Sequence, residues 1–353
     1  MPNAIITKTG SYIPELRISN EHFIDYEFYG ADGTRLERSG REIIAKFEQI
    51  TGIKERRYAT DDLNTADLAL IAAEQALDDF DRESLDYIIV AQNLGDVAAD
   101  NIRSDMVPTI AARVKHRLKI KNPYTVAFDI PFGCPGWLHG VILADYYIKS
   151  GDAERVLVIG VELLSRVSDP HDVDSMIYAD GAGATLLEAV DRPVGILSHT
   201  TRSDTLDDVY LLRLGKSYNP HHSGDELFIK MDGHDIYRYV VNTLPPLIKQ
   251  SLDKAGYTLT DVNKIFSHQA NQKMIEAVQE RLLRLYQLRQ APNRLMPMTI
   301  SCLGNSSVAT IPTLFDLVMR GKMDDHQLHS GDIIVFASVG AGMNANSVVY
   351  RMP

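Results

Sequence analysis

Residues 72–92 read AAEQALDDFDRESLDYIIVAQ, and a related pattern, LIKQSLDKAGYTLTDVNKIFSHQ, occurs at residues 247–269. Each stretch begins with a helix-like run in which Gln and Leu-Asp are in step. Each then passes through an acidic turn into a short apolar strand that ends in Gln. The two stretches lie roughly half of the 353-residue chain apart. This spacing predicts an α/β fold built from two copies of one unit.

The repeat continues downstream and pairs two reactive residues. Cys134 and Asn305 each open a segment that continues as a helix, a glycine stop and an apolar strand. His268 stands at the end of a strand in the second copy, where ligand chemistry is common in α/β sheets. Copies in a duplicated α/β fold pack about a pseudo-twofold axis, so we expect matching loops to meet. A thiol, an imidazole and an amide in one pocket indicate acyl chemistry on the thiol.

The bulk composition is that of an ordinary globular protein, with 45% hydrophobic and 24% charged residues. A formal net charge of −11 argues against general nucleic-acid binding, which requires a basic surface. The two cysteines, Cys134 and Cys302, argue against a disulfide framework and favour a cytoplasmic location. The sequence shows neither a signal-peptide pattern nor an apolar run of membrane-spanning length. Its residue spacings predict no metal site and no bound nucleotide.

The halves are expected to span residues 1–191 and 192–353, the first with the nucleophilic Cys and the second with His and Asn. No low-complexity linker separates them, and Asp191-Arg192-Pro193 is the expected boundary. Residues 18–50 are polar and contain several turn signals, so we expect an irregular surface insertion or flap there.

The segment after Cys134 is locally the most informative. Pro135 is favoured at the first position of a helix, which leaves Cys134 as the expected N-cap. The following run, WLHGVILADYYIKS, is apolar almost all round and stops at Gly151, so it predicts a buried helix. A thiol at the positive end of such a helix is expected to favour the thiolate.

Each candidate also has an ordinary structural interpretation. A lone cysteine is usually an inert small hydrophobic residue, and we adopt that interpretation for Cys302. His268 alone would more often be a structural histidine, and Asn305 could be a plain N-cap. The glycine turn at residues 339–343 is either a tight turn or a place where backbone N–H groups approach a substrate oxygen.

Basic residues gather near the expected pocket. Residues 264–294 contain six Lys or Arg residues against two Glu. The more common explanation of such a cluster is a solvated helix face. The more specific, functional explanation is a docking patch for an acidic partner. The basic residues are Lys264, Lys273, Arg281, Arg284, Arg289 and Arg294.

Together these motifs resemble the thiolase superfamily, and specifically the β-ketoacyl-[acyl carrier protein] synthase III-like enzymes. The resemblance covers nearly the whole chain, and each motif is weak alone but the set is specific. It includes TGIKERRYA at 51–59, the Cys134 loop, ADYYIKSG at 144–151, Ser168-Asp-Pro170, DGAGA from 180, HQAN at 268–271, GNSS at 304–307 and the glycine turn near 340.

The resemblance implies a thiolase-like five-layer αβαβα fold and a homodimer. It implies decarboxylative condensation of a Cys-bound acyl group with a malonyl (or β-ketoacyl) carrier thioester, in fatty-acid or specialised lipid or polyketide synthesis, without a cofactor. Cys134 matches the nucleophile, and His268 and Asn305 match the pair that assists decarboxylation. Gly340 matches the glycine whose N–H joins that of Cys134 in the oxyanion hole. The acyl carrier protein is the implied partner, with Lys273, Arg281 and Arg284 as candidate docking residues.

The chain departs from the family pattern around the substrate. Its only tryptophan is Trp137, so the tryptophan that typically stacks on coenzyme A before the TGIKERR turn is absent. The arginine that usually follows the Asp-Pro segment is replaced by Val173 or Asp174. Acyl-CoA and an acyl carrier protein therefore both stay open as donors. Val107 stands where a large aromatic residue typically floors the acyl pocket, which predicts a roomier pocket for a longer, branched or aryl acyl group.

Three other functions compete with condensation. A cysteine hydrolase also uses Cys, His and Asn, but no protease signature surrounds Cys134. An acyltransferase of the same fold would pass the acyl group to a hydroxyl or an amine. A non-catalytic partner subunit would have no need for all three reactive residues.

Overall fold

The computed structural model describes residues 2–291 and 294–353, which form two β-sheets with helices on both sides of each. The first sheet has the strand order β1-β7-β6-β4-β5, and the second has the order β11-β12-β13-β8. The strands of the first sheet are β1 (Asn3–Tyr12), β4 (Tyr87–Ala91), β5 (Val126–Ile130), β6 (Arg155–Leu163) and β7 (Asp180–Val190). Those of the second are β8 (Gly195–Ser203), β11 (Val262–Ser267), β12 (Ile333–Gly340) and β13 (Asn344–Arg351).

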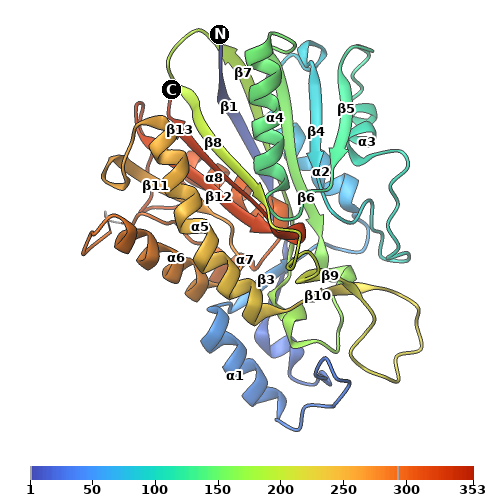
Figure 1. The fold of residues 1–353 in the computed structure, drawn as a ribbon. Coiled ribbons are helices and arrows are strands. Elements are labelled where there is room, and N and C mark those ends of the chain that lie inside the picture. The colour runs from blue at the N-terminus through green and yellow to red at the C-terminus, as the bar shows by residue number, and fades with distance from the viewer. Residues whose placement is uncertain (1, 292–293) are drawn as a thin grey trace.

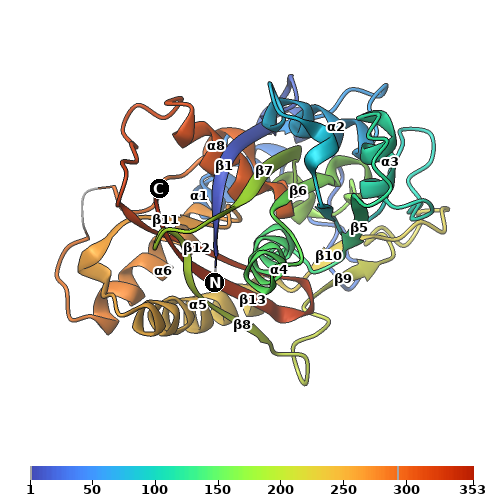
Figure 2. The same ribbon diagram turned by 90° about the horizontal axis from the view of Figure 1, so that it is seen from above.

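The helices complete five layers. Between the sheets lie α4 (Gly136–Ser150) and α8 (Thr310–Met319), as Figures 1 and 2 show. The outer face of the first sheet is covered by α2 (Thr65–Ala76) and α3 (Ile110–Arg117). The outer face of the second is covered by α5 (Gly233–Ala255) and α6 (Gln272–Leu285). The predicted thiolase-like αβαβα architecture is therefore confirmed.

The strand orders make the internal repeat visible. β1-β7-β6-β4 in the first sheet corresponds to β8-β13-β12-β11 in the second, with the same parallel and antiparallel pairings. β5 forms the far edge of the first sheet, and among the described residues no strand is paired at the corresponding edge of the second sheet. The turn at residues 191–194 joins β7 of one sheet to β8 of the other.

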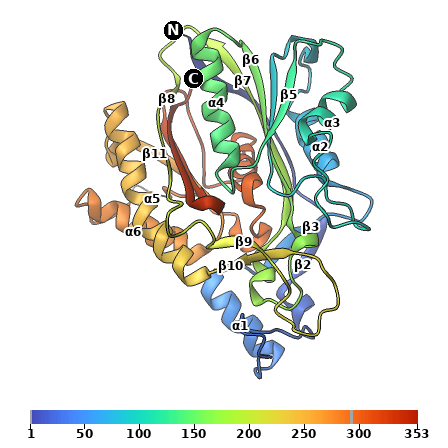
Figure 3. The same ribbon diagram turned by 45° about the vertical axis from the view of Figure 1, so that its right-hand side comes forward.

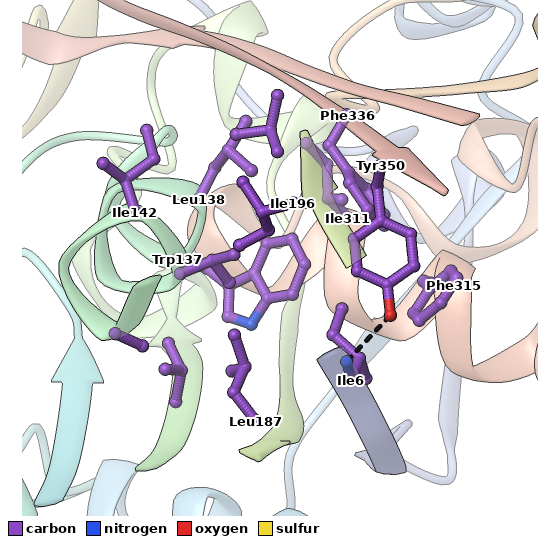
Figure 4. Packing of buried hydrophobic residues seen from close by; sticks show 14 of the residues in the cluster. Ile6, Trp137, Leu138, Ile142, Leu187, Ile196, Ile311, Phe315, Phe336 and Tyr350 are labelled. Atoms are coloured by element: carbon purple, nitrogen blue, oxygen red, sulfur yellow. Dashed lines mark hydrogen bonds between the residues drawn. The ribbon is translucent and has the colours of Figure 1, made fainter. Parts of the chain in front are cut away.

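The core between the sheets joins the two halves (Figure 4). Trp137 of α4 packs edge-on against Phe336 of β12, with ring centroids 5.6 Å apart. The Tyr350 hydroxyl accepts a hydrogen bond from the backbone N–H of Ile6 at 2.8 Å, which ties the last strand to the first. Truncation of a fully buried Trp typically costs about 3–5 kcal/mol, so this core contributes strongly to holding the sheets together.

The expectation of an irregular flap at residues 18–50 holds for residues 24–39 and is wrong for the rest. The segment contains β2 (Leu16–Ser19) and α1 (Gly40–Thr51), and β2 pairs with β3 (Glu55–Tyr58). α1 starts at a capping box in which Ser39 and Glu42 satisfy each other's backbone N–H groups. One face of the helix, with Ile43, Ile44 and Phe47, is buried. Polar turn residues concealed this amphipathic helix in the sequence.

Three smaller elements complete the fold. β9 (Leu212–Gly215) and β10 (Phe228–Met231) form an antiparallel ribbon that leads into α5, as Figure 3 shows. The short helix α7 (Ile300–Leu303) precedes Asn305. Within the described parts of the chain, no helix combines the length and the hydropathy needed to cross a membrane.

Candidate active site

Cys134, His268, Asn305 and Gly340 all line one cavity of about 450 Å³. Cys134 lies in the turn between β5 and α4, and Gly340 ends β12. His268 directly follows β11, and Asn305 lies between α7 and α8. The first residue belongs to one half of the chain and the other three to the second. The predicted meeting of the two halves at one pocket is therefore observed, while the roles of these residues stay predictions.

Cys134 lies two residues before α4 rather than at its N-cap, which is Pro135. The hydroxyl of Ser307 donates to the Cys134 sulfur at 3.4 Å. Burial raises the pKa of the Cys134 thiol to about 11, and the Ser307 bond opposes this only in part. The thiol therefore prevails at neutral pH, contrary to the expectation that the helix terminus alone would favour the thiolate.

His268 is fixed by backbone and side-chain bonds. Its backbone N–H donates to the Ala337 carbonyl at 3.0 Å, which continues the pairing of β11 with β12. Its Nδ1 lies 2.8 Å from the Thr310 hydroxyl at the start of α8. Burial lowers the pKa of His268 to about 4, so the imidazole is neutral at physiological pH.

Asn305 is held on both sides by backbone bonds. Its N–H donates to Ile177 and its carbonyl accepts from Ala179, at 3.0 and 2.9 Å. Its side-chain oxygen accepts from the backbone N–H of Ser307 at 2.8 Å. This bond stays within the loop, and α8 has no side-chain cap bond, so Asn305 is not a plain helix cap. The same bond fixes which end of the amide carries the Nδ2 donor.

The backbones of Gly340 and Cys134 pack directly against each other. A Cβ atom on Gly340 would lie 2.3 Å from the Cys134 nitrogen, closer than any real side chain could be. Gly133, just before the cysteine, has φ +65°, and a Cβ there would lie 2.5 Å from the Ala341 nitrogen. Glycine is therefore required at both positions for the two N–H-bearing segments to meet.

The rest of the cavity is largely apolar. Its apolar walls come from the β9–β10 ribbon, α5 and α6 in the second half of the chain, together with Leu94, Phe132 and Leu164 of the first half. These walls suit an acyl chain or another apolar group. Representative residues are Leu212, Ile229, Val240, Leu244, Ile275 and Val278.

The proposed substrate-binding residues lie in different places. Val107 is 85% exposed and outside the lining of the cavity, so it does not floor the pocket within a single chain. Lys273 is exposed at the first turn of α6, next to Met274 of the cavity wall. Arg281 and Arg284 are exposed on the same helix, about 12 to 17 Å further along it at about 1.5 Å per residue.

Two members of the predicted basic patch serve the fold instead. Lys264 is buried, and its ammonium donates to the Arg294 carbonyl at 2.9 Å. The Arg294 side chain pairs with Asp325. Lys264 therefore contributes no exposed charge, and the patch is weaker than its sequence suggests.

Several polar residues of the site escaped the sequence reasoning. Asn93 and Glu162 both line the cavity, and Thr310 and Ser307 bond to His268 and Cys134. Ser307 was part of the GNSS motif, but nothing marked it as a partner of the cysteine. Glu162 ends a continuous apolar strand, and a charged residue at such a place was the available signal.

Comparisons with known proteins identify relatives of similar sequence and fold. Models of the 3-oxoacyl-[acyl-carrier-protein] synthase III family and of its C-terminal region match residues 128–205 and 252–352. A β-ketoacyl-[acyl-carrier-protein] synthase III from Bacillus pumilus is 33% identical over 353 residues, which are 99% of each chain.

Solved structures are similar over almost the full length. The β-ketoacyl-[acyl-carrier-protein] synthase III from Thermus thermophilus superposes with a TM-score of 0.80 at 28% identity, covering 99% of each chain. The 3-oxoacyl-(acyl carrier protein) synthase III from Pseudomonas aeruginosa PAO1 gives 0.81 at 27% identity, covering 99% of this chain and 98% of that one.

Proposed function

The chain belongs to the β-ketoacyl-[acyl-carrier-protein] synthase III family of acyl-transferring condensing enzymes, and we propose that Cys134 carries the acyl group. In this proposal, the acyl group is condensed with a malonyl-carrier thioester with loss of CO₂. The observation that carries the assignment is the meeting of Cys134, His268, Asn305 and Gly340 in one cavity.

The first step is acyl transfer to sulfur. Cys134 loses its proton and its sulfur attacks the carbonyl of the donor thioester. The C–S bond to the donor breaks, and the proton lost from Cys134 is taken up by the departing donor thiolate. The backbone N–H groups of Cys134 and Gly340 are the candidates for stabilising the tetrahedral oxyanion, since their backbones adjoin at the cavity. One such donor is worth about 3–4 kcal/mol in other acyl-transfer enzymes.

The second step is loss of CO₂ from the malonyl group. The C–C bond to the carboxylate breaks, its electron pair forms an enolate, and negative charge develops on the thioester oxygen. A strong base is unnecessary, but two hydrogen-bond donors at that oxygen are needed. The neutral His268 imidazole and the Asn305 amide suit this task. The enolate carbon then attacks the acyl carbonyl on Cys134 and releases the thiolate.

Thr310 gives this step a requirement on the histidine tautomer. For His268 to donate from Nε2, its Nδ1 must accept a hydrogen bond. The Thr310 hydroxyl lies 2.8 Å from Nδ1 and 2.9 Å from the Ser307 carbonyl, and its single hydrogen can serve only one of them at a time. The proposed reaction requires that hydrogen to point to His268.

The apolar walls suit an acyl group longer than acetyl. One side of the cavity of about 450 Å³ is lined by aliphatic side chains from α5, α6 and the β9–β10 ribbon. Profiling of purified enzyme with acyl donors of increasing length tests this, and a strict acetyl preference would refute it. Running each chain length on coenzyme A and on acyl carrier protein also identifies the donor.

An acidic carrier protein is the proposed partner. Lys273 stands beside the cavity wall, and Arg281 and Arg284 continue along the same exposed helix. Arg284 is partly neutralised by Glu280, 3.6 Å away, so Lys273 is expected to contribute most. Charge reversal at Lys273 should raise KM for the malonyl carrier more than reversal at Arg284 does.

The proposed homodimer has a suitable surface at β5. This strand is the edge of its sheet, and Val126 in it is 47% exposed. Met106, Val107 and Tyr124 nearby in the chain are also exposed, at 40%, 85% and 85%. An unprotected apolar edge commonly pairs with another chain. Analytical ultracentrifugation tests the dimer, and a Val126→Lys variant should dissociate it.

One labelling experiment separates condensation from the competing activities. Cys134 is loaded with a radioactive acyl thioester, and malonyl carrier is then added. Condensation predicts loss of the label from the enzyme together with CO₂ release. Release of free acid without malonyl carrier would instead indicate a hydrolase. Transfer to an added alcohol or amine without CO₂ release would indicate an acyltransferase of the same fold.

A further inference from the structure

A buried carboxyl group lies in the same cavity as Cys134 and has no part in the proposed reaction. Glu162 is 1% exposed near the end of β6, and both it and Asn93 line the cavity. The carboxylate oxygen Oε1 accepts a hydrogen bond from the side-chain amide of Asn93. A buried, hydrogen-bonded carboxyl beside a nucleophile requires a physical explanation.

Asn93 connects this carboxyl to the nucleophile turn. While its Nδ2 donates to Glu162, its Oδ1 accepts from the backbone N–H of Gly133 at 2.8 Å. Rotating the amide by 180° would set its N–H groups against the Gly133 N–H and its oxygen against the carboxyl. The contact with the Gly133 N–H would be repulsive at any pH, and the contact with the carboxyl would be repulsive whenever Glu162 is ionised, so the Gly133 N–H above all holds the amide in one orientation.

The turn is confined from the opposite side as well. A Cβ on Gly133 would lie 2.5 Å from the nitrogen and 2.8 Å from the oxygen of Ala341. Gly133 is thus pressed between the 340–341 segment and the Asn93 amide. Its position determines where the next residue, Cys134, presents its sulfur and its N–H.

We propose that Asn93 and Glu162 form a positioning pair that holds the Gly133–Cys134 turn in register with Gly340, and that the charge of Glu162 acts on the Cys134 sulfur. The pair touches no reacting atom in this proposal. It acts through the turn, and its effect on turnover rests on the proposed acyl transfer to Cys134.

The electrostatic part follows from the groups around Glu162. Burial raises the pKa of this carboxyl to about 8, Asn93 opposes the shift, and the negative charge of Asp180 on β7 adds to it. Asp180 is bonded to Ser165 and lies near Arg166. Ionised Glu162 raises the pKa of Cys134. The other titratable residues in the cavity lining are Tyr178, Arg213 and His268.

The sign of the pH effect can be worked out. Below about pH 8 the carboxyl is mostly neutral and does not oppose the thiolate. Above about pH 8, the Glu162 carboxylate repels the thiolate, so that Cys134 loses its proton only at higher pH. A Glu162→Gln variant keeps an oxygen acceptor for Asn93 but cannot ionise, so its Cys134 should form the thiolate at lower pH than in the unaltered protein.

The test compares two reactions of the same sulfur. Iodoacetamide alkylates thiolates without any acyl donor or oxyanion hole, and peptide mapping resolves Cys134 from the exposed Cys302. Acylation by a donor thioester requires the oxyanion hole in addition. Both rates are measured from about pH 6 to 10 for the full chain and for the Asn93→Ala and Glu162→Gln variants. Glu154→Gln is the matched control, because the Glu154 side chain is exposed to solvent.

Each variant has a distinct expected result. Asn93→Ala should slow acylation by about 10- to 100-fold, while alkylation of Cys134 at pH 7 changes by less than about threefold. Glu162→Gln should acylate at pH 7 within about threefold of the unaltered rate. Its alkylation profile should lie at least about half a pH unit lower, with Cys302 unchanged.

Two outcomes would overturn the proposal. If Asn93→Ala is acylated as fast as the unaltered protein, the pair does not position the turn. If the alkylation profile of Glu162→Gln coincides with that of the unaltered protein, the charge of Glu162 does not act on the Cys134 sulfur. If no donor acylates even the unaltered chain, the proposed function fails, but the alkylation profiles still decide the role of Glu162. An unchanged Cys302 rate and melting temperature exclude general unfolding as the cause.

Discussion

The loops that carry Cys134 and Asn305 are equivalent in the two halves, yet they present different chemical groups to one cavity. Each reactive residue follows a glycine with positive φ, +65° at Gly133 and +70° at Gly304. A Cβ on Gly304 would lie 2.6 Å from that of the buried Arg56, so both turns are pressed against a neighbouring segment. The same backbone device therefore presents a thiol in one half and an amide in the other.

The environments of the two loops account for the difference. Burial keeps the Cys134 sulfur protonated, so the first loop must gain charge to react. The neutral Asn305 amide is oriented by Ser307, and the neutral His268 imidazole lies beside the Thr310 hydroxyl, so the proposed decarboxylation requires no change of charge on either residue. In the proposed reaction, equivalent loops of the two copies therefore serve separate steps.

Replacing the proposed nucleophile should distinguish the roles of the two loops most clearly. Cys134→Ala is expected to reduce condensation by at least about 1,000-fold, because no acyl-enzyme can form. Decarboxylation of malonyl carrier should persist, because His268 and Asn305 are intact. CO₂ release and product formation are measured in parallel, with Cys302→Ala as the control. Equal loss of both activities would contradict the division of labour.

Removing the amide should have the reverse effect. Asn305→Ala is expected to leave acylation of Cys134 within a few-fold and to slow decarboxylation by about 100- to 1,000-fold, since one donor to the enolate oxygen is lost. Mass spectrometry of the acyl-enzyme and CO₂ release give the two rates. Asn101→Ala, in an exposed loop, is the control. A variant that no longer acylates would show that Asn305 belongs to both steps.

Adding a methyl group to Gly340, whose backbone packs against that of Cys134, should slow acylation of Cys134. Gly340→Ala would force its Cβ against the Cys134 nitrogen, and we expect acylation to fall about 100-fold. Gly233→Ala is the comparison, because its φ lies outside the left-handed region and its Cβ would meet only an Asp174 oxygen at 3.9 Å. Stopped-flow acylation measures the effect. Normal acylation by Gly340→Ala would exclude the proposed oxyanion hole.

The two steps should also respond differently to pH. Because the pKa of Cys134 is raised to about 11, acylation should rise about tenfold per pH unit at pH values below about 8, where Glu162 is neutral. Decarboxylation in Cys134→Ala should stay nearly flat from about pH 5.5 to 8, because the pKa of His268 is lowered to about 4 and its charge does not change in that range. Parallel profiles would indicate a shared titrating group.

The smallest expected effect tests the histidine tautomer. Thr310→Val removes the hydroxyl beside His268 Nδ1 and should slow decarboxylation about tenfold while acylation changes little. Thr313→Val, one turn further along α8, is the matched control, since its hydroxyl makes only a 3.4 Å bond to Ala182. If both variants slow decarboxylation equally, Thr310 contributes only to packing and does not set the tautomer of His268.

Much of the fold was predictable because it is repeated. The matching helix, turn and strand signals marked two α/β units, and the nearly all-apolar helix after Cys134 correctly indicated a buried central element. The amphipathic helix α1 was missed, because the polar residues before it read as a loop. Its Ser39–Glu42 capping box is a sequence signal that had been available.

The sequence by itself determined the two-copy architecture and which reactive residue types stand at equivalent places, because periodicity and spacing survive in a linear chain. Only the tertiary structure decided the state of those groups. Four features depend on burial and on partners from distant segments. They are the raised pKa of Cys134, the neutral state of His268, the burial of Lys264 and the hydrogen bonds that link Glu162 to Gly133 through Asn93. Desolvation and hydrogen-bond orientation are properties of packed neighbours, and no local pattern encodes them.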